Sequence, residues 1–357
     1  MQQSVSTSTR ECPAALPKSI QNESELEEVL TRPSSALIEF IKSVSSPLLV
    51  LGAGGKMGPT LAVLARRAAE AAGHPLEVVA VSRFSNDASR QWLEKRGVKT
   101  VSCDLLDSDA VTRLPEAKNI IYLVGLKFGT AQNPAATWAI NTIVPARVCE
   151  RYPQSRIVAL STGNVYPQST VSRGGSVESD SLTPLGEYAN AAVGRERIFE
   201  YYSSRQRTPV ALLRLFYAVE LRYGVLVDIA RKIHSGQPVS LANGYFNCIW
   251  QCDANELILR SLLLATAPAS VYNLCLSEMF SVRDIATQFA ELLGRAPIFS
   301  GSETQTALLG NSARLRNSLA STPTNMETVL RWIADWVKQG GHDLGRPTHF
   351  EVRDGKY

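Results

Sequence analysis

The chain has 357 residues, which is enough for one large α/β unit or for two lobes. Its composition of 45% hydrophobic and 20% charged residues permits a packed core, and its net charge of +4 is far below that of a nucleic-acid-binding protein. No stretch approaches about 18 uninterrupted apolar residues, and the N-terminus has no apolar run typical of a signal peptide. We therefore expect a cytoplasmic protein that binds neither membranes nor nucleic acid.

Cysteine and histidine positions give no metal-ligand spacing. The six cysteines include no Cys-x-x-Cys pair, and the four histidines are scattered. We expect reduced, mostly buried thiols and no metal site. The cysteines are Cys12, Cys103, Cys149, Cys248, Cys252 and Cys275.

Residues 1–45 form an N-terminal extension with two short helices. Ser24 and Glu27 match a capping box, so we expect a helix that begins with Ser24 as N-cap and ends before Pro33. A second short helix is expected over 35–43. This arm is expected to pack on its own domain or on a partner subunit.

Apolar strands alternate with helices from Ser46 onward. Strands are expected in the run after Ser46 and at 77–81, 98–103, 119–125, 156–161 and 210–216, with helices at 59–72, 86–96, 134–151 and 188–203. This alternation predicts a Rossmann-fold α/β domain, a doubly wound parallel sheet, over 46–220. The pattern weakens afterwards, which indicates a smaller substrate-binding lobe over 221–340 with elements that return to the sheet. The polar tail 341–357 is not assigned.

A glycine turn follows the first strand. Gly52, Gly55 and Gly58 have the spacing G-x-x-G-x-x-G between a strand and a helix. Gly52 permits the sharp turn, Gly55 permits close approach of a pyrophosphate, and Gly58 permits close packing of the helix. Pro59 suits the first helical turn. The pattern predicts a dinucleotide site at the helix N-terminus, where free N–H groups favour anions.

The residues around this turn bear on the cofactor. Lys56 and Met57 lie inside it, and Lys56 either adds positive charge near the phosphates or faces water. The second strand ends at Ser82 and Arg83, without the Asp or Glu that NAD sites usually carry. Arg83 is suited to pair with a 2′-phosphate, which favours NADP over NAD, or else it is a solvated surface arginine.

Two further residues follow the third strand. Asp104 is placed to contact the adenine edge, with Leu105 against the ring face. Asp104 is equally suited to cap the next helix, and the two roles are compatible.

The chain resembles the extended short-chain dehydrogenase/reductases, the NAD-dependent epimerase/dehydratase group, over roughly residues 46–338. The resemblance rests on the glycine turn, on Asp104-Leu105 and on Tyr122-Leu123-Val124-Gly125. It also rests on Asn141, on the run STGNVYP from Ser161, on VESDSLTPLGEYANAAVGRERIFEYY, on LRLFYAVELRYG and on SVRDIATQFAELLGRAP. It implies that Val124 and Gly125 contact the cofactor, and that the substrate is a sugar, a sugar acid or a sugar nucleotide.

In that family a Ser/Thr, a Tyr and a Lys in Tyr-x-x-x-Lys perform the hydride chemistry. The resemblance assigns Thr162 to bind the substrate oxygen and Tyr188 to exchange the proton and contact the cofactor. The lysine position is Ala192. An ordinary tyrosine has a pKa of ~10, and lowering it to ~7 requires about 4 kcal/mol, part of which that lysine normally supplies.

For several residues near this motif the sequence allows more than one role. Arg195 lies seven residues after Tyr188, on the same helix face but about two turns along. It either reaches partway toward the tyrosine or, as we expect, pairs at the surface or near Glu196. Asn141 is either close to an active-site water chain or bonded to its own helix backbone. The aromatic residues Tyr217, Tyr223 and Trp250 are more typical of core than of a substrate pocket.

These observations predict an NAD(P)-dependent oxidoreductase, epimerase or dehydratase that acts by hydride transfer on a small carbohydrate-derived substrate. Ala192 keeps an alternative open, a dinucleotide-binding protein without turnover that serves as a sensor or structural partner. A homodimer is expected, because members of the family often pair through the helix of the Tyr motif, and ANAAVGRERIF supplies small residues for close packing.

Overall fold

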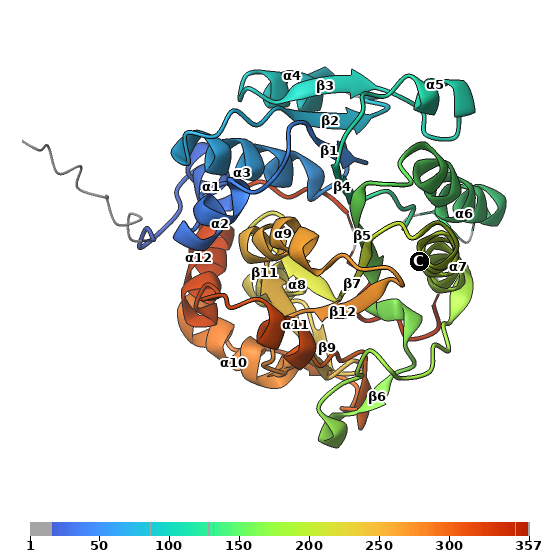
Figure 1. Cartoon of the computed structure of the whole chain (residues 1–357). Coiled ribbons are helices and arrows are strands. Elements are labelled where there is room, and N and C mark those ends of the chain that lie inside the picture. The colour runs from blue at the N-terminus through green and yellow to red at the C-terminus, as the bar shows by residue number, and fades with distance from the viewer. Residues whose placement is uncertain (1–15, 86, 128, 131, 347, 356–357) are drawn as a thin grey trace, which may run out of the picture.

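The computed structural model describes residues 16–355 except 86, 128, 131 and 347. Seven parallel strands form one sheet in the order β12-β7-β5-β4-β1-β2-β3 (Figure 1). The order reverses between β1 and β4, which is the switch point where doubly wound folds bind ligands. The predicted Rossmann fold is confirmed. The strands are β1 (Leu48–Leu51), β2 (Val78–Ser82), β3 (Lys99–Ser102), β4 (Asn119–Tyr122), β5 (Arg156–Thr162), β7 (Val210–Leu215) and β12 (Ser270–Leu274).

Helices cover both faces of this sheet. In Figure 1, α6 and α7 lie on one side of the strands, and α3 and α9 lie on the other. The helices are α1 (Glu23–Leu30), α2 (Ser35–Ile41), α3 (Gly58–Ala71), α4 (Asp87–Glu94), α5 (Ser108–Thr112), α6 (Pro134–Arg151), α7 (Gly186–Gln206), α8 (Val225–Ser235), α9 (Gln251–Arg260), α10 (Val282–Leu293), α11 (Ala313–Ser318) and α12 (Met326–Lys338). None of the helices in the described residues is long and apolar enough to cross a membrane.

The alternation of side chains along each strand divides the core into two layers. Leu48 and Val50 of β1 join the core on the α3 and α9 side, whereas Leu49 and Leu51 join the core on the α6 and α7 side. All four are fully buried. Such double burial explains why β1 is a continuous apolar run rather than an alternating pattern.

Short strands outside the main sheet belong mostly to the C-terminal half. They are β6 (Ser169–Thr170), β8 (Tyr217–Val219), β9 (Val239–Ser240), β10 (Tyr245–Phe246), β11 (Cys248–Trp250), β13 (Phe280–Ser281), β14 (Phe299–Ser300) and β15 (Thr306–Ala307), paired in four small ladders. The five described cysteines are all free and buried, as expected from the sequence. Cys12 lies outside the described residues.

The N-terminal helices pack on the chain's own domain. Asn22, not Ser24, is the N-cap of α1, because its side chain accepts from the Glu25 N–H at 3.0 Å, so the predicted capping box is wrong by two positions. Glu28 then pairs with Arg67 of α3 at 2.7 Å. The expected arm therefore covers α3.

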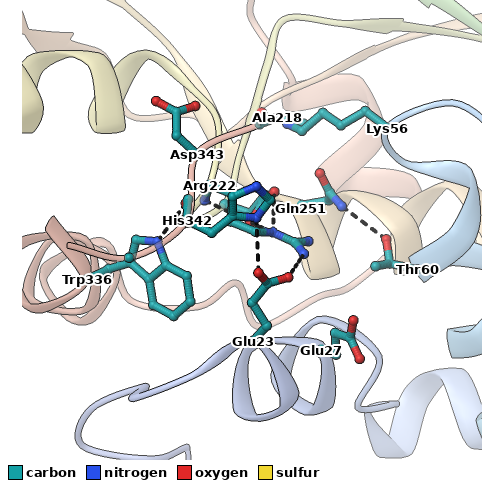
Figure 2. Close-up of polar contacts among 12 residues, drawn as sticks. Glu23, Glu27, Lys56, Thr60, Ala218, Arg222, Gln251, Trp336, His342 and Asp343 are labelled. Carbon is teal, nitrogen blue, oxygen red and sulfur yellow. Dashed lines mark hydrogen bonds and ion pairs between the residues drawn. The ribbon is translucent and has the colours of Figure 1, made fainter. Parts of the chain in front are cut away.

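The C-terminal tail returns to the same region. Figure 2 shows Glu23 of α1 between His342 and Arg222, with contacts of 3.0 and 3.2 Å. Further along, the tail reaches the start of α7. A Cβ on Gly186 would lie 2.1 Å from the Gly355 carbonyl oxygen, so this contact requires glycine. The tail is thus joined to both α1 and α7.

A buried ion pair connects α7 to the sheet. The Arg214 and Glu196 side chains are 3% and 0% exposed, and the Arg214 Nη2 and Glu196 Oε2 atoms lie 2.7 Å apart. Glu196 also accepts from the Ser161 hydroxyl, and Arg214 also donates to the Tyr166 hydroxyl. Because each charge is compensated only by this network, removal of one partner leaves the other uncompensated.

We expect Arg214→Met to lower the free energy of unfolding by about 3–5 kcal/mol, because it leaves the Glu196 carboxylate buried without a cation. The matched control is Arg197→Met on the same helix, which removes an exposed pair with Glu200 and should cost less than about 1 kcal/mol. Urea unfolding measures both. Equal losses in the two variants would contradict the assignment.

Candidate active site

Close contacts explain three glycines of the turn: Gly52 and Gly58 lie against backbone, and Gly54 lies against the Ser82 side chain. Gly52 has φ +82°, and a Cβ there would lie 2.9 Å from the Val124 N. A Cβ on Gly58 would lie 2.5 Å from the Ala53 carbonyl oxygen, and one on Gly54 would lie 2.6 Å from the Ser82 Oγ. A Cβ on Gly55 would meet only the Gly52 oxygen, at 3.4 Å. Protein packing therefore explains Gly52, Gly54 and Gly58 but does not by itself require Gly55.

The turn leads directly into the N-terminus of α3. Met57 is the N-cap and provides no side-chain hydrogen bond, and Pro59 occupies the first turn as predicted. The first N–H groups of the helix therefore lack a side-chain cap. Such a terminus attracts anions through those groups and through the helix dipole.

One cavity of about 260 Å³ brings the turn together with the predicted catalytic pair. It lies at the carboxyl edge of the sheet, where α/β folds bind ligands. The turn residues lining it are Gly52, Gly55, Lys56, Met57 and Gly58, joined by Gly125, Thr162, Tyr188, Arg195, Tyr223 and the tail residues Leu344, Arg346 and Thr348. Ser82, Arg83, Asp104, Leu105 and Val124 do not line it.

Thr162 ends β5 with a hydroxyl oriented by its own loop. Its Oγ1 accepts from the Asn164 N–H at 3.2 Å and from the Asn164 Nδ2 at 3.1 Å. A hydroxyl that accepts twice keeps its proton available to donate. Tyr188, in the first turn of α7, is 8% exposed and lines the same cavity.

Lys56 points into the molecule rather than into water, which excludes the water-facing alternative. Its Nζ donates to the Ala218 carbonyl oxygen at 2.7 Å and lies 4.3 Å from the centroid of the Tyr223 ring. Figure 2 shows the side chain extended from the turn toward Ala218. Burial lowers the pKa of Lys56 to about 7, against the opposing charge of Glu220.

The charged side chains that line the cavity are all basic. Lys127 donates to the Thr348 carbonyl oxygen at 3.4 Å, and burial lowers its pKa to about 8. With Lys56, Arg195 and Arg346 it gives four basic residues, and no aspartate or glutamate of the described chain is part of the lining. A cavity with this excess of positive charge suits an anionic ligand.

The remaining predicted cofactor residues lie along the edge beyond this cavity. Ser82 contacts Gly54, as described above, and Arg83 is exposed. Asp104 accepts from the Leu106 N–H at 2.9 Å. The next helix, α5, is capped by Asp107 instead, so the capping alternative for Asp104 is wrong. Leu105 is 7% exposed.

Of two residues near the Tyr motif, Arg195 differs from expectation, whereas Asn141 follows one of its two predicted alternatives, a bond to its own helix backbone. Arg195 is only 4% exposed, and its Nη1 donates to the Val124 carbonyl oxygen at 2.8 Å, so the predicted surface pairing is wrong. Asn141 is fully buried and donates to the Thr137 carbonyl oxygen of its own helix at 2.8 Å. Of the aromatic residues, Tyr217 and Tyr223 line the cavity, whereas Trp250 belongs to the core.

The sequence patterns did not identify Lys127, or any residue of the C-terminal tail, as part of the cavity lining. Lys127 lies in the loop after β4, and Arg346 and Thr348 lie in a polar segment without periodicity. Neither position has a pattern that identifies it as part of a site. The net charge of +4 is consistent with an anionic ligand but does not locate its site.

The sheet order, with a cavity at the switch point of its carboxyl edge, is that of a Rossmann-like α/β protein. A family model for the NAD dependent epimerase/dehydratase family matches residues 48–247, which is more than half of the chain. The protein belongs to this family, as the resemblance implied. None of the curated protein sequences matches it.

Solved structures share the same architecture at low sequence identity. The UDP-Glc/GlcNAc 4-epimerase of Campylobacter jejuni matches with a TM-score of 0.67 and 18% identity, over 83% of this chain and 100% of that one. The UDP-glucuronic acid 4-epimerase of Bacillus cereus, in complex with NAD, matches with a TM-score of 0.68 and 18% identity, over 82% and 96%. The UDP-glucose 4-epimerase of Thermus thermophilus, also with NAD, gives 0.65 and 18%, over 82% and 99%. These similarities show that the protein shares its fold with these structures.

Dinucleotide binding should be accompanied by proton uptake at pH 8. The pKa of Lys56 is about 7 in the free protein, so the amine is mostly neutral at that pH, and a nearby pyrophosphate raises its affinity for a proton. Calorimetric titration in two buffers of different ionisation enthalpy measures the uptake. We expect Lys56→Met to reduce it and the exposed control Lys42→Met to leave it unchanged. Equal uptake in wild type and Lys56→Met would contradict the role of Lys56.

Proposed function

We propose that this protein is a nicotinamide-dinucleotide-dependent enzyme that acts by hydride transfer on a sugar nucleotide or related sugar. The observation that carries the proposal is the single cavity shared by the glycine turn, Thr162 and Tyr188. Membership of the NAD-dependent epimerase/dehydratase family supports it. The solved structures similar in fold include epimerases of UDP-sugars crystallised with NAD.

The residues of the turn fit the pyrophosphate of such a cofactor. The uncapped N-terminus of α3 supplies N–H donors. Gly55 leaves the ligand side open, since a Cβ there has almost no protein neighbour, which is what close approach of a phosphate requires. Lys56 adds a cation beside this position. Gly125, Val124, Asp104 and Leu105 are proposed to contact the remainder of the dinucleotide along the sheet edge.

The substrate oxygen is proposed to lie between Thr162 and Tyr188. Thr162, whose oxygen accepts from Asn164, donates its single hydroxyl proton to that substrate oxygen. Tyr188 takes the proton of the substrate hydroxyl while the adjoining carbon loses its hydride. The nicotinamide ring supplies the chemistry of accepting and returning that hydride at C4. Return of the hydride to the opposite face of the carbon would invert its configuration, and return to the same face would restore it.

Turnover of a panel of UDP-sugars, followed by chromatography of the sugar products, tests the reaction. We expect Tyr188→Phe to lower kcat by about 10²–10⁴, because the general acid–base group is lost. Thr162→Val should lower it by about 10²–10³ through loss of one donor to the reacting oxygen. Both variants should still bind the dinucleotide. Undiminished turnover in Tyr188→Phe would exclude the mechanism.

The cofactor preference depends on Arg83. The residue directly after β2 is Arg83 rather than an aspartate or glutamate, and the exposed Arg83 is proposed to pair with a 2′-phosphate, which favours NADP. The similar structures that contain NAD favour NAD. We expect calorimetric titration of protein freed of co-purified nucleotide to show tighter binding of NADP, with the preference lost in Arg83→Ala. A preference for NAD, unchanged in Arg83→Ala, would remove this role and leave the enzyme proposal intact.

The rival function is dinucleotide binding without turnover, and Ala192 is the observation that favours it. Ala192 occupies the position of the family's lysine, and its side chain is fully buried. This rival predicts tight dinucleotide binding together with no product from any sugar in the panel. It also predicts that Tyr188→Phe changes nothing measurable.

A homodimer through α6 and α7 remains part of the proposal. Ile143 and Tyr201 leave apolar surface exposed on these helices, 44% and 54% respectively. At least one of the small residues of α7 also packs within the chain. A Cβ on Gly194 would lie 3.1 Å from the Thr142 side chain, so Gly194 packs α7 against α6 of the same chain.

A further inference from the structure

Ala192 provides no cation at the position of the family's lysine. Arg195, one turn further along the same helix, provides one. Arg195 extends from α7 and lines the cavity that contains Thr162 and Tyr188. Side chains on an α-helix lean toward its N-terminus, so a long side chain at 195 points back over the turn that carries Ala192. Its Nη1 reaches the Val124 carbonyl oxygen, just beyond the end of β4.

The guanidinium of Arg195 occupies space that is open because residue 125 is glycine. A Cβ on Gly125 would lie 2.6 Å from the Arg195 Nη1 and 3.7 Å from the Asn141 Oδ1. The guanidinium therefore lies against the backbone of Gly125, a cavity-lining residue, and close to Asn141 of α6. Any larger residue at 125 would displace it.

The polar atoms around Arg195 are not satisfied by the protein alone. The Arg195 Nε, the Asn141 Oδ1 and the Tyr122 hydroxyl are each buried without a hydrogen-bond partner among the described residues. No carboxylate in the described part of the chain forms an ion pair with Arg195, although its side chain is only 4% exposed. Buried polar groups normally have partners, and a buried charge normally has a counter-charge or a ligand.

We propose that Arg195 takes over the role of the missing lysine, with its guanidinium donating to the nicotinamide-ribose hydroxyls and placing positive charge beside Tyr188. The inference rests on the proposed function, since it assumes that a nicotinamide dinucleotide occupies the cavity. Arginine suits this role because it has five donors and stays charged. One donor bonds to Val124, and others remain for the ribose.

A binding experiment tests this without any assumption about the sugar. NAD(P) affinity is measured by calorimetry for wild type, Arg195→Met, the double variant Ala192→Lys/Arg195→Met, and the control Arg197→Met. Methionine retains the buried stem and removes the charge. Arg197 lies on the same helix but is exposed and pairs with Glu200.

We expect Arg195→Met to bind the dinucleotide about tenfold to a hundredfold more weakly, in line with the loss of hydrogen bonds from a charged donor. The double variant should recover most of that affinity, because the introduced lysine would restore the family arrangement. A merely structural arginine would not be replaced by a lysine one turn away. The control should bind like wild type.

The single variant Ala192→Lys guards against a folding defect in Arg195→Met. If Arg195 already supplies the cation, an added lysine meets a like charge and brings no gain in affinity. A gain in affinity for Ala192→Lys, or wild-type affinity in a folded Arg195→Met, would overturn the inference while the proposed function stands. Absence of dinucleotide binding by the wild type would instead overturn the proposed function, and this inference with it.

Discussion

The close approach of three backbone segments at the carboxyl edge of the sheet is the constraint on which the site depends. Gly58 lies against Ala53, and Gly52 lies against the backbone that follows β4, at distances that leave no space for a Cβ. These contacts bring the N-terminus of α3 and the loop after β4 to one point. Because parallel strands all end at this edge, Thr162 on β5 and Tyr188 on α7 reach the same cavity.

The charged side chains around that cavity are all basic, so an anionic ligand would balance their charge. Lys56, Lys127, Arg195 and Arg346 line it without a carboxylate from the described chain. Burial lowers the pKa values of Lys56 and Lys127, which indicates that the protein alone does not stabilise their charged forms well. An anionic dinucleotide and an anionic sugar nucleotide would supply the missing negative charge. Position 192 has no lysine, but the cavity that contains Tyr188 is lined by four basic residues.

The N-terminal extension and the C-terminal tail meet over this region. Glu23 of α1 pairs with His342 and Arg222, and the tail beyond them contributes Arg346 and Thr348 to the cavity before it reaches Gly186. Thr348 is held from two sides, because it donates to Asp228 and its carbonyl oxygen accepts from Lys127. Both segments are thus structural neighbours of the site rather than separate appendages.

Local patterns in the amino-acid sequence were enough to predict the sheet, the glycine turn and the family, because strand alternation, glycine spacing and the Thr162 and Tyr188 motifs are each read over a few residues. They also show that alanine, and not lysine, lies four residues after Tyr188. The folded chain was needed to see that Asn22 rather than Ser24 caps α1, that Lys56 turns inward, that Arg195 is buried and that the tail lines the cavity. Most of these features depend on contacts between segments far apart in the chain. The direction of a long basic side chain is set by the space its neighbours leave, and no local pattern records that space.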